Sequence, residues 1–297
     1  MTGHVKIGTT MTNCWQQETP ASPAKHRPER NRHHPTQPNI LDPQSIIHAT
    51  HDQTHQQVHH GEGRDQNKRH EEDPGNYLVP EASIIGHELC RQTVIDTGLL
   101  ALHPLFPGVE WGNLELAPPT ITFNDRMEIY TGDLKIELIF MGPAHTTNDI
   151  VAWLPERKLL FAGDLIFNQG TPFVAMGSVS GSLQALKRLR ELGAETIIPG
   201  HGSVCGPEVM DDIEAYLTFI QETARDAFDA GLDPLQASRQ ADLGRFAGWH
   251  DAERIAGNLH RAYSELRWEP AGTVLDFGPI VADMVSLNGG QPVRCLA

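Results

Sequence analysis

Three short signatures each place a metal-competent side chain directly after a run of β-branched or aliphatic residues. They restrict the chain to folds in which several strands end close together. The signatures are Gly142-Pro143-Ala144-His145, Phe161-Ala162-Gly163-Asp164 and Pro199-Gly200-His201-Gly202. Imidazole and carboxylate groups at the ends of successive strands are ligands that a borderline ion such as Zn²⁺ prefers. The joint spacing of 19 and 37 residues between the three side chains is more specific than any one signature.

Each of the three side chains also has an ordinary interpretation when it is considered alone. His145 could be a surface or capping residue, and Asp164 could cap a turn or a helix. His201 stands between two glycines, so it could be a turn residue. The metal hypothesis therefore depends on the three signatures together.

From residue 76 onward, the sequence predicts strands that alternate with helices. Apolar periodicity places strands at residues 83–86, 120–123, 127–130, 134–141, 149–154, 158–162 and 196–198. It places helices at residues 87–100, 180–192, 233–241 and 251–268, and a long helix between Pro207 and Gly231. We therefore expect an α/β domain over residues 76–206 and a C-terminal helical extension over residues 207–297.

The first quarter of the chain has a different character. Residues 1–75 contain one Leu, no Phe and ten of the sixteen His, and prolines interrupt any helical period. We expect this segment to be disordered or aberrant, and not folded. A shifted reading frame is one explanation, and a genuine, divergent His-rich tail is the other. Sequencing the coding DNA would separate the two.

Charge and cysteine content restrict the partners and the compartment. The chain has 23 Lys and Arg residues and 38 Asp and Glu residues. Residues 1–75 hold 8 of the basic residues and 9 of the acidic ones, so residues 76–297 hold 15 basic and 29 acidic residues. Such an acidic domain repels phosphate backbones, which argues against a nucleic acid partner. Four widely spaced cysteines form no CxxC pair, and no stretch of about 18 apolar residues occurs. We expect a cytoplasmic protein without a membrane anchor, and a homo-oligomer stays possible.

The three signatures resemble the third, fourth and fifth metal motifs of the metallo-β-lactamase superfamily. The resemblance implies an αββα sandwich and a hydrolytic centre with two zinc ions. By this resemblance, His145 completes a three-His site and His201 serves the second ion. Asp164 bridges the two ions and is the residue on which catalysis depends. Metal coordination lowers the pKa of bound water to about 7, which supplies the nucleophile.

The superfamily also has a His-x-His-x-Asp-His motif a few residues before Gly75-Asn76, and this chain departs from it. With a small shift in register, His70 and Asp73 become the nearest candidate ligands, and His59-His60 are weaker candidates. Counted back without a gap, the four ligand positions hold none of the expected residues; they hold Asn67, Arg69, Glu71 and Glu72. Full occupancy by zinc is therefore doubtful for the sequence as it stands.

A narrower resemblance runs from about residue 75 to residue 297. Residues 111–119, 170–173, 177–179 and 288–297 are similar to the second-ring cyclase and thioesterase proteins of aromatic polyketide antibiotic pathways, of the actinorhodin dimerase/cyclase type. That resemblance implies a polyketide intermediate as substrate, held as a thioester on an acyl carrier protein. The implied chemistry is aldol ring closure and thioester cleavage.

The segment after Asp164 offers apolar side chains for such a substrate. We expect Phe167, Phe173 and Met176 to form a wall beside the metals, although packing within the loop explains them nearly as well. Two other functions stay open. One is a general thioester hydrolase of metallo-β-lactamase fold that acts on small free thioesters, and the other is a non-catalytic scaffold or dimerising factor with a vacant metal site.

Overall fold

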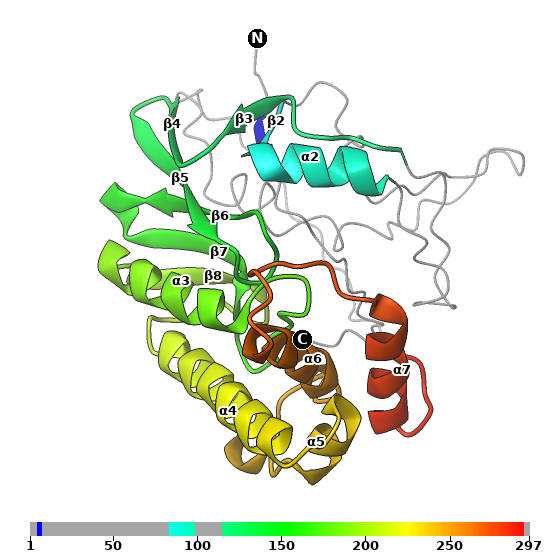
Figure 1. Ribbon diagram of the computed structural model, residues 1–297. Helices are drawn as coiled ribbons and strands as arrows, with labels where there is room; N and C mark the ends of the chain where they lie inside the picture. The colour runs from blue at the N-terminus through cyan, green and yellow to red at the C-terminus, as the bar shows by residue number, and fades with distance from the viewer. Residues whose placement is uncertain (1–4, 8–82, 99–114, 294–297) are drawn as a thin grey trace, which may run out of the picture.

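The computed structural model describes residues 5–7, 83–98 and 115–293, and it contains two β-sheets between layers of helices (Figure 1). The smaller sheet has the order β1-β2-β3, with parallel pairing throughout. Its strands are β1 (Val5–Ile7), β2 (Ser83–His87) and β3 (Ile121–Phe123). The larger sheet follows chain order, with antiparallel pairs up to β7 and a parallel pair of β7 with β8. Its strands are β4 (Arg126–Thr131), β5 (Leu134–Gly142), β6 (Asp149–Leu154), β7 (Leu159–Phe167) and β8 (Thr196–His201).

Helices cover the outer faces of both sheets (Figure 1). Helix α2 (Glu88–Thr97) lies on the smaller sheet, while α3 (Val179–Leu192) and α4 (Val209–Asp229) lie on the larger one. This order of layers confirms the αββα sandwich that the sequence predicted. Three further helices follow α4; they are α5 (Pro234–Gln240), α6 (Arg254–Leu266) and α7 (Phe277–Leu287). Short 3₁₀ helices occur at Pro155–Arg157 and Gly244–Phe246.

Strand β6 shows how the larger sheet is buried on both faces. Ile150, Ala152 and Leu154 belong to the core between the two sheets. Val151 and Trp153 point the other way, into the core beneath the helices. Successive side chains of a strand point to opposite faces, so an unbroken apolar run is what a doubly covered strand requires.

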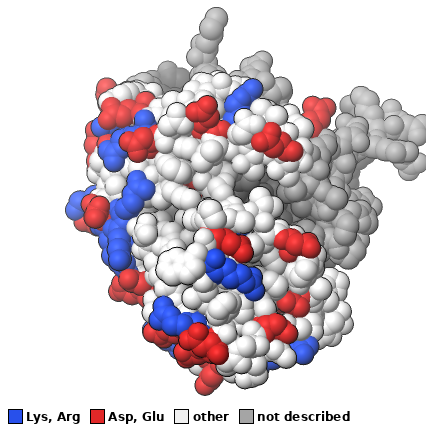
Figure 2. Space-filling view, in the orientation of Figure 1, with Lys and Arg blue, Asp and Glu red and all other residues white. Residues whose placement is uncertain are grey.

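The second core joins the larger sheet to α3, α4 and α6. Leu160 of β7 and Leu186 of α3 belong to it, and so do Leu217 of α4 and Leu259 of α6. The expected boundary at residue 206 therefore crosses one continuous apolar core. At the surface, Arg190 of α3 forms ion pairs with two carboxylates of α4, at 2.8 and 2.7 Å. Figure 2 shows the same pattern more widely, because Lys and Arg side chains lie beside Asp and Glu at several places on this face.

Several elements differ from the sequence prediction. Helix α2 ends at Thr97, three residues before the expected end at residue 100; Cys90 lies on its inner face and Leu89 is 46% exposed. Helix α7 was not predicted; it begins after Asp276, whose side chain accepts a hydrogen bond from the Gly278 amide. Strand β1 forms at Val5–Ile7, within the segment that we expected not to fold, and the rest of residues 1–75 lies outside the described residues.

No helix within the described ranges is long and apolar enough to cross a bilayer. Helix α4 is the longest of those given above, with 21 residues, and it carries charged residues along its length.

Truncation of the core between the sheets should destabilise the fold strongly. Leu138 of β5 is 0% exposed, so Leu138→Ala should lower the free energy of unfolding by about 2–5 kcal/mol through lost burial and cavity formation. Val274 is 94% exposed, and Val274→Ala should change it by less than about 0.5 kcal/mol. Urea denaturation of the two variants measures both effects; equal effects would show that the two sheets do not share a core.

Candidate metal centre

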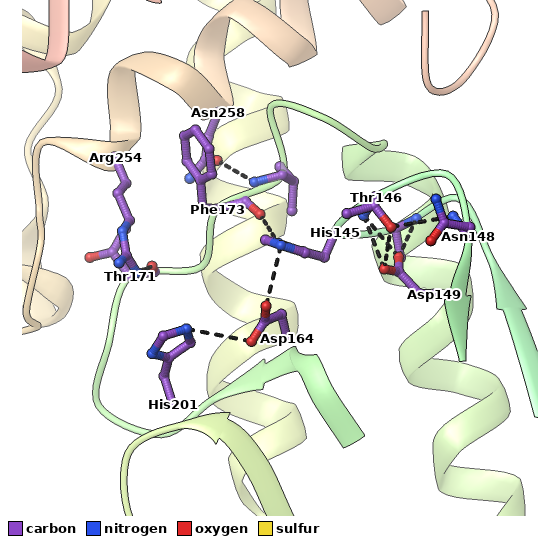
Figure 3. A network of polar contacts seen from close by, with 12 residues as sticks. His145, Thr146, Asn148, Asp149, Asp164, Thr171, Phe173, His201, Arg254 and Asn258 are labelled. Atoms are coloured by element: carbon purple, nitrogen blue, oxygen red, sulfur yellow. Dashed lines mark hydrogen bonds and ion pairs between the residues drawn. The ribbon is translucent and has the colours of Figure 1, made fainter. Parts of the chain in front are cut away.

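His145, Asp164 and His201 come together at one end of the larger sheet (Figure 3). His145 lies in the loop that follows β5, Asp164 lies within β7, and His201 is the last residue of β8. One oxygen of the Asp164 carboxylate is 3.4 Å from Nε2 of His145, and the other oxygen is 3.4 Å from Nε2 of His201. A single carboxylate therefore faces two imidazoles, with one oxygen for each.

The backbone carbonyl of Phe173 determines how His145 presents its ring. Nδ1 of His145 is hydrogen-bonded to the carbonyl oxygen of Phe173. A carbonyl oxygen can only accept, so Nδ1 carries a proton, and Nε2 is the ring nitrogen that faces Asp164. This is the arrangement in which a histidine ligates a metal through Nε2, with its second nitrogen held by a backbone carbonyl.

Asp149 holds the loop that carries His145. Its carboxylate accepts hydrogen bonds from the backbone amides of Ala144 and Thr146, and from the Thr146 hydroxyl at 2.6 Å. Burial raises the pKa of Asp149, while the nearby His145 and the bonds from Thr146 act in the opposite direction. The loop is therefore closed by a buried carboxylate at the first residue of β6.

An aromatic ring packs against the imidazole of His201. Phe167 stacks on the His201 imidazole, with ring centroids 4.7 Å apart and an interplanar angle of 13°. The guanidinium of Arg254, from α6, lies over Phe167 at 5.4 Å from the ring centroid. Arg254 is buried, which lowers the pKa of its guanidinium, and Asp251 pairs with it at 2.9 Å. The His201 imidazole, the Phe167 ring and the Arg254 guanidinium thus stack on one another in this order.

Glycines permit the close approach of the segments at this site. A Cβ on Gly200 would lie 2.0 Å from Oδ1 of Asp164, and a Cβ on Gly177 would lie 2.0 Å from the carbonyl oxygen of Ala144. Gly202 has a φ of 88°, in the left-handed region that favours glycine. Gly200 of the third signature therefore keeps the space beside Asp164 open.

The donor chemistry of these side chains fits zinc, and so does their spacing. Two ligands of one tetrahedral zinc ion at about 2.0–2.1 Å stand roughly 3.4 Å apart, which equals both imidazole-to-carboxylate distances. Within the described ranges, however, no three His, Cys, Asp or Glu side chains are arranged to hold one ion. The predicted ligands His70 and Asp73 lie outside the described residues. The described residues thus supply one imidazole–carboxylate pair to each of two expected ions.

The apolar residues after Asp164 lie in different surroundings. Phe167 is 2% exposed and supports His201, so it faces the core and not a substrate cavity. The Phe173 ring packs edge-on against Phe277 of α7, while its carbonyl faces His145. Met176 is partly exposed. Of the three apolar side chains expected to form a wall, Phe167 is thus buried, while Phe173 and Met176 are both partly exposed.

Sequence reasoning missed the polar residues that support the three signatures. Asp149 begins a strand and was counted only as part of it, although Thr146 three residues before it was a signal for a closed polar loop. Arg254 lies more than 50 residues beyond the last signature. Only a fold that returns α6 to the sheet brings it near the site.

Cys205 follows the third signature but has no catalytic surroundings. Its backbone pairs with Ile197 of β8, at 2.8 and 3.0 Å, and its thiol lies 3.8 Å from the Ile197 carbonyl oxygen. Burial raises the pKa of the thiol to about 11, with a smaller contribution from Glu208. The thiol is therefore structural in character and poorly nucleophilic.

Comparison with known proteins gives one family over most of the chain. The family model of the metallo-beta-lactamase superfamily matches residues 4–201. The match begins within the segment where the upstream ligand motif is missing, and it ends at His201. Helices α4 to α7 lie beyond it.

Two of the relatives that match are named as a hydrolase and a thioesterase. The chain is 27% identical to a hydroxyacylglutathione hydrolase of Rhodospirillum rubrum over 169 residues. The aligned region covers 57% of this chain and 60% of that protein. The chain is also 27% identical to an acyl-coenzyme A thioesterase of Bos taurus over 100 residues, and this aligned region covers 32% of this chain and 36% of that protein. The chain thus spans less than two thirds of the length of these curated relatives. A solved metallo-beta-lactamase from Pontibacter korlensis is 19% identical, with a TM-score of 0.39 and coverage of 48% and 60%.

Substitution of Gly200 should damage the centre without adding any polar group. In Gly200→Ala the new methyl would displace the Asp164 carboxylate, so zinc affinity should fall by more than about 10-fold. A methyl group on Gly248 would meet no atom within 4 Å, so Gly248→Ala is the matched control and should bind as the unmodified protein does. Titration with a zinc-competing dye measures both. Unchanged affinity in Gly200→Ala would remove Asp164 from the ligand set.

The Cys205 thiol should react slowly with alkylating agents. With a pKa of about 11, its thiolate fraction at pH 8 is roughly 0.1%, against about a quarter for an ordinary thiol near 8.5. Iodoacetamide labelling followed by peptide mass spectrometry should show slow modification that rises toward pH 11. Rapid labelling at pH 8 would contradict the burial of the thiol.

Proposed function

The chain belongs to the metallo-beta-lactamase superfamily, and we propose that it is a zinc-dependent hydrolase of thioesters that acts on an aromatic polyketide carried by an acyl carrier protein. The observation that carries the proposal is the position of Asp164. Its two carboxylate oxygens face two different imidazoles at 3.4 Å each. A carboxylate placed in this way is suited to join two metal ions.

The names of two relatives support the reaction class. Hydroxyacylglutathione hydrolase and acyl-coenzyme A thioesterase both name enzymes that cleave the bond between an acyl group and a thiol sulfur. The family match over residues 4–201 contains the three candidate ligands His145, Asp164 and His201. We therefore assign thioester cleavage to the centre in preference to hydrolysis of an amide or a phosphate ester.

The substrate class rests on the narrower sequence resemblance. Residues 170–173 and 177–179, which are similar to the aromatic polyketide cyclase and thioesterase proteins, form the segment that lies against His145. Met176 in this segment is partly exposed and could contact a flat apolar ring. The partner that delivers such a substrate is an acyl carrier protein, because a polyketide intermediate is held on one as a thioester.

The described residues have separable roles in this reaction. Zinc at such a site polarises a carbonyl group and lowers the pKa of water toward 7. His145, Asp164 and His201 would hold the ions, and the Phe173 carbonyl keeps the proton of His145 on Nδ1. Phe167 covers the inner face of His201 and excludes water there. Asp149 holds the His145 loop in place through its hydrogen bonds to the amides of Ala144 and Thr146.

Three thioester substrates distinguish the candidate functions in the zinc-loaded full-length protein. An aromatic polyketide mimic on an acyl carrier protein should be cleaved with a higher kcat/KM than a hydroxyacylglutathione or an acyl-coenzyme A. Preference for the free thioesters would indicate a general thioester hydrolase. No cleavage of any of the three, together with less than one zinc per chain, would indicate a non-catalytic scaffold.

Removal of the bridging charge should abolish turnover. Asp164→Asn keeps the size of the side chain but replaces one anionic oxygen by an amide, so both zinc content and kcat/KM should fall, the latter by more than about 100-fold. Asp211→Asn is the matched control, because Asp211 lies on the surface of α4 and pairs with Arg190. Plasma emission for zinc and the thioester assay measure the two effects. An Asp164→Asn protein that retains full activity would exclude the proposed centre.

A further inference from the structure

The segment of residues 171–180 joins the β7 side of the site to helix α3 and is largely buried. Much of its backbone therefore cannot obtain hydrogen bonds from strands, helices or water. Buried backbone donors and acceptors without partners are costly, so partners must come from elsewhere in the protein. Helix α6 supplies several of these hydrogen-bond partners.

Four polar side chains of α6 face this segment and form a stripe, Arg254, Asn258, Arg261 and Glu265. Their spacing of four, three and four residues places them on one side of the helix. The carbonyl oxygen of Thr171 accepts a hydrogen bond from Arg254 at 2.9 Å. We call this set the α6 polar stripe.

Asn258 contacts the segment on both sides of Phe173. Its Oδ1 accepts from the Val174 amide at 2.9 Å, and its Nδ2 donates to the Pro172 carbonyl at 2.8 Å. Nδ2 also lies 3.1 Å from the Tyr216 hydroxyl of α4. Asn258 is 0% exposed, so these bonds are not exchanged for water. The two residues that flank Phe173 are thus fixed by one amide (Figure 3).

The remainder of the stripe fixes the second half of the segment. Arg261 donates through Nε and Nη2 to the Ala175 carbonyl, at 3.0 and 2.6 Å. The Glu265 carboxylate accepts from the Ser178 hydroxyl and from the amides of Val179 and Ser180, at 2.9, 2.6 and 3.1 Å. A carboxylate at the first amides of α3 is also favoured by the helix dipole.

The α6 polar stripe is connected to both imidazoles of the centre, in each case through one residue that lies between the stripe and the imidazole. Asn258 fixes the flanks of Phe173, whose carbonyl accepts from Nδ1 of His145. Arg254 lies over Phe167, which stacks on His201. The α6 polar stripe lies beyond the family match, which ends at residue 201. The support is therefore supplied by the C-terminal extension of this chain.

We infer that the α6 polar stripe positions the metal centre, and that Asn258 in particular sets the Nδ1–H form of His145 by fixing the Phe173 carbonyl. This inference rests on the proposed role of His145 as a zinc ligand. Asn258 is a positioning residue, because it touches neither the imidazole nor the place of the ions. Hydrogen-bonded partners of this kind typically change metal affinity by about 10–100-fold when they are removed.

The test compares Asn258→Ala with His260→Ala in the full-length protein. His260 lies on the same helix, but it pairs with Asp283 of α7 at 2.7 Å and does not contact the segment. Two readouts are needed: zinc affinity by competition with a chelating dye, and the ¹⁵N and ¹H signals of the His145 ring in metal-free protein. The ring signals are assigned by comparison with His145→Gln.

Asn258→Ala should weaken zinc binding by about 10–100-fold and replace the protected Nδ1–H signal of His145 by one that exchanges with solvent. His260→Ala should leave both unchanged, even where it lowers the Tm. If Asn258→Ala does not fold, Glu265→Gln tests the same stripe at a partly exposed position and should shift both readouts in the same direction by a smaller amount. Wild-type affinity and a wild-type ring signal in folded Asn258→Ala protein would overturn the inference.

The outcomes separate this inference from the proposed function. A protein that binds zinc in an Asn258-dependent way but cleaves no thioester retains the positioning role and loses the proposed reaction. A protein that cleaves thioesters, with zinc affinity and His145 signals indifferent to Asn258, retains the reaction and loses the positioning role. The ring signal in metal-free protein decides the second point without any activity measurement.

Discussion

The backbone of a buried, irregular segment needs hydrogen-bond partners from outside itself, and the rest of this site depends on how that need is met. Residues 171–180 obtain several of them from one side of α6, through two guanidinium groups, an amide and a carboxylate. Burial of Asn258 and Arg261 would be costly on its own, but each bond that they make satisfies a backbone group that would otherwise be unpaired. The same bonds determine where the carbonyl opposite His145 stands.

Close contact between backbones is the second condition, and it explains where the glycines lie. A Cβ on Gly181 would stand 1.8 Å from the Pro143 carbonyl oxygen, so α3 could not approach the His145 loop with any other residue there. Gly200 and Gly177 play the same part beside Asp164 and Ala144. The candidate metal centre is thus compact because the segments around it approach one another through their main chains.

Much of the fold could be predicted from the sequence because its elements are amphipathic or continuously apolar. Strand β6 and helix α3 were expected within one residue of their observed bounds, and Gly193 ends α3 with the positive φ of 71° that a helix end favours. The support of the site could not be predicted. Sequence periodicity shows that α6 has a polar side, which includes Asn258 and Arg261, but it does not show what covers that side. Helix α7 was missed because a short apolar run with Gly278 and Pro279 at its start does not distinguish a helix from a strand.

Helix α6 also affects how this protein can be divided. The region that matches the superfamily stops at residue 201 and contains all three signatures, yet the groups that complete the hydrogen bonds of its buried segment lie between residues 254 and 265. The portion that matches the superfamily is therefore not self-sufficient in hydrogen bonds in this chain. Without α6, the backbone groups of residues 171–180 that it contacts would lack these partners, so the matched region and the C-terminal helices depend on each other for their hydrogen bonds.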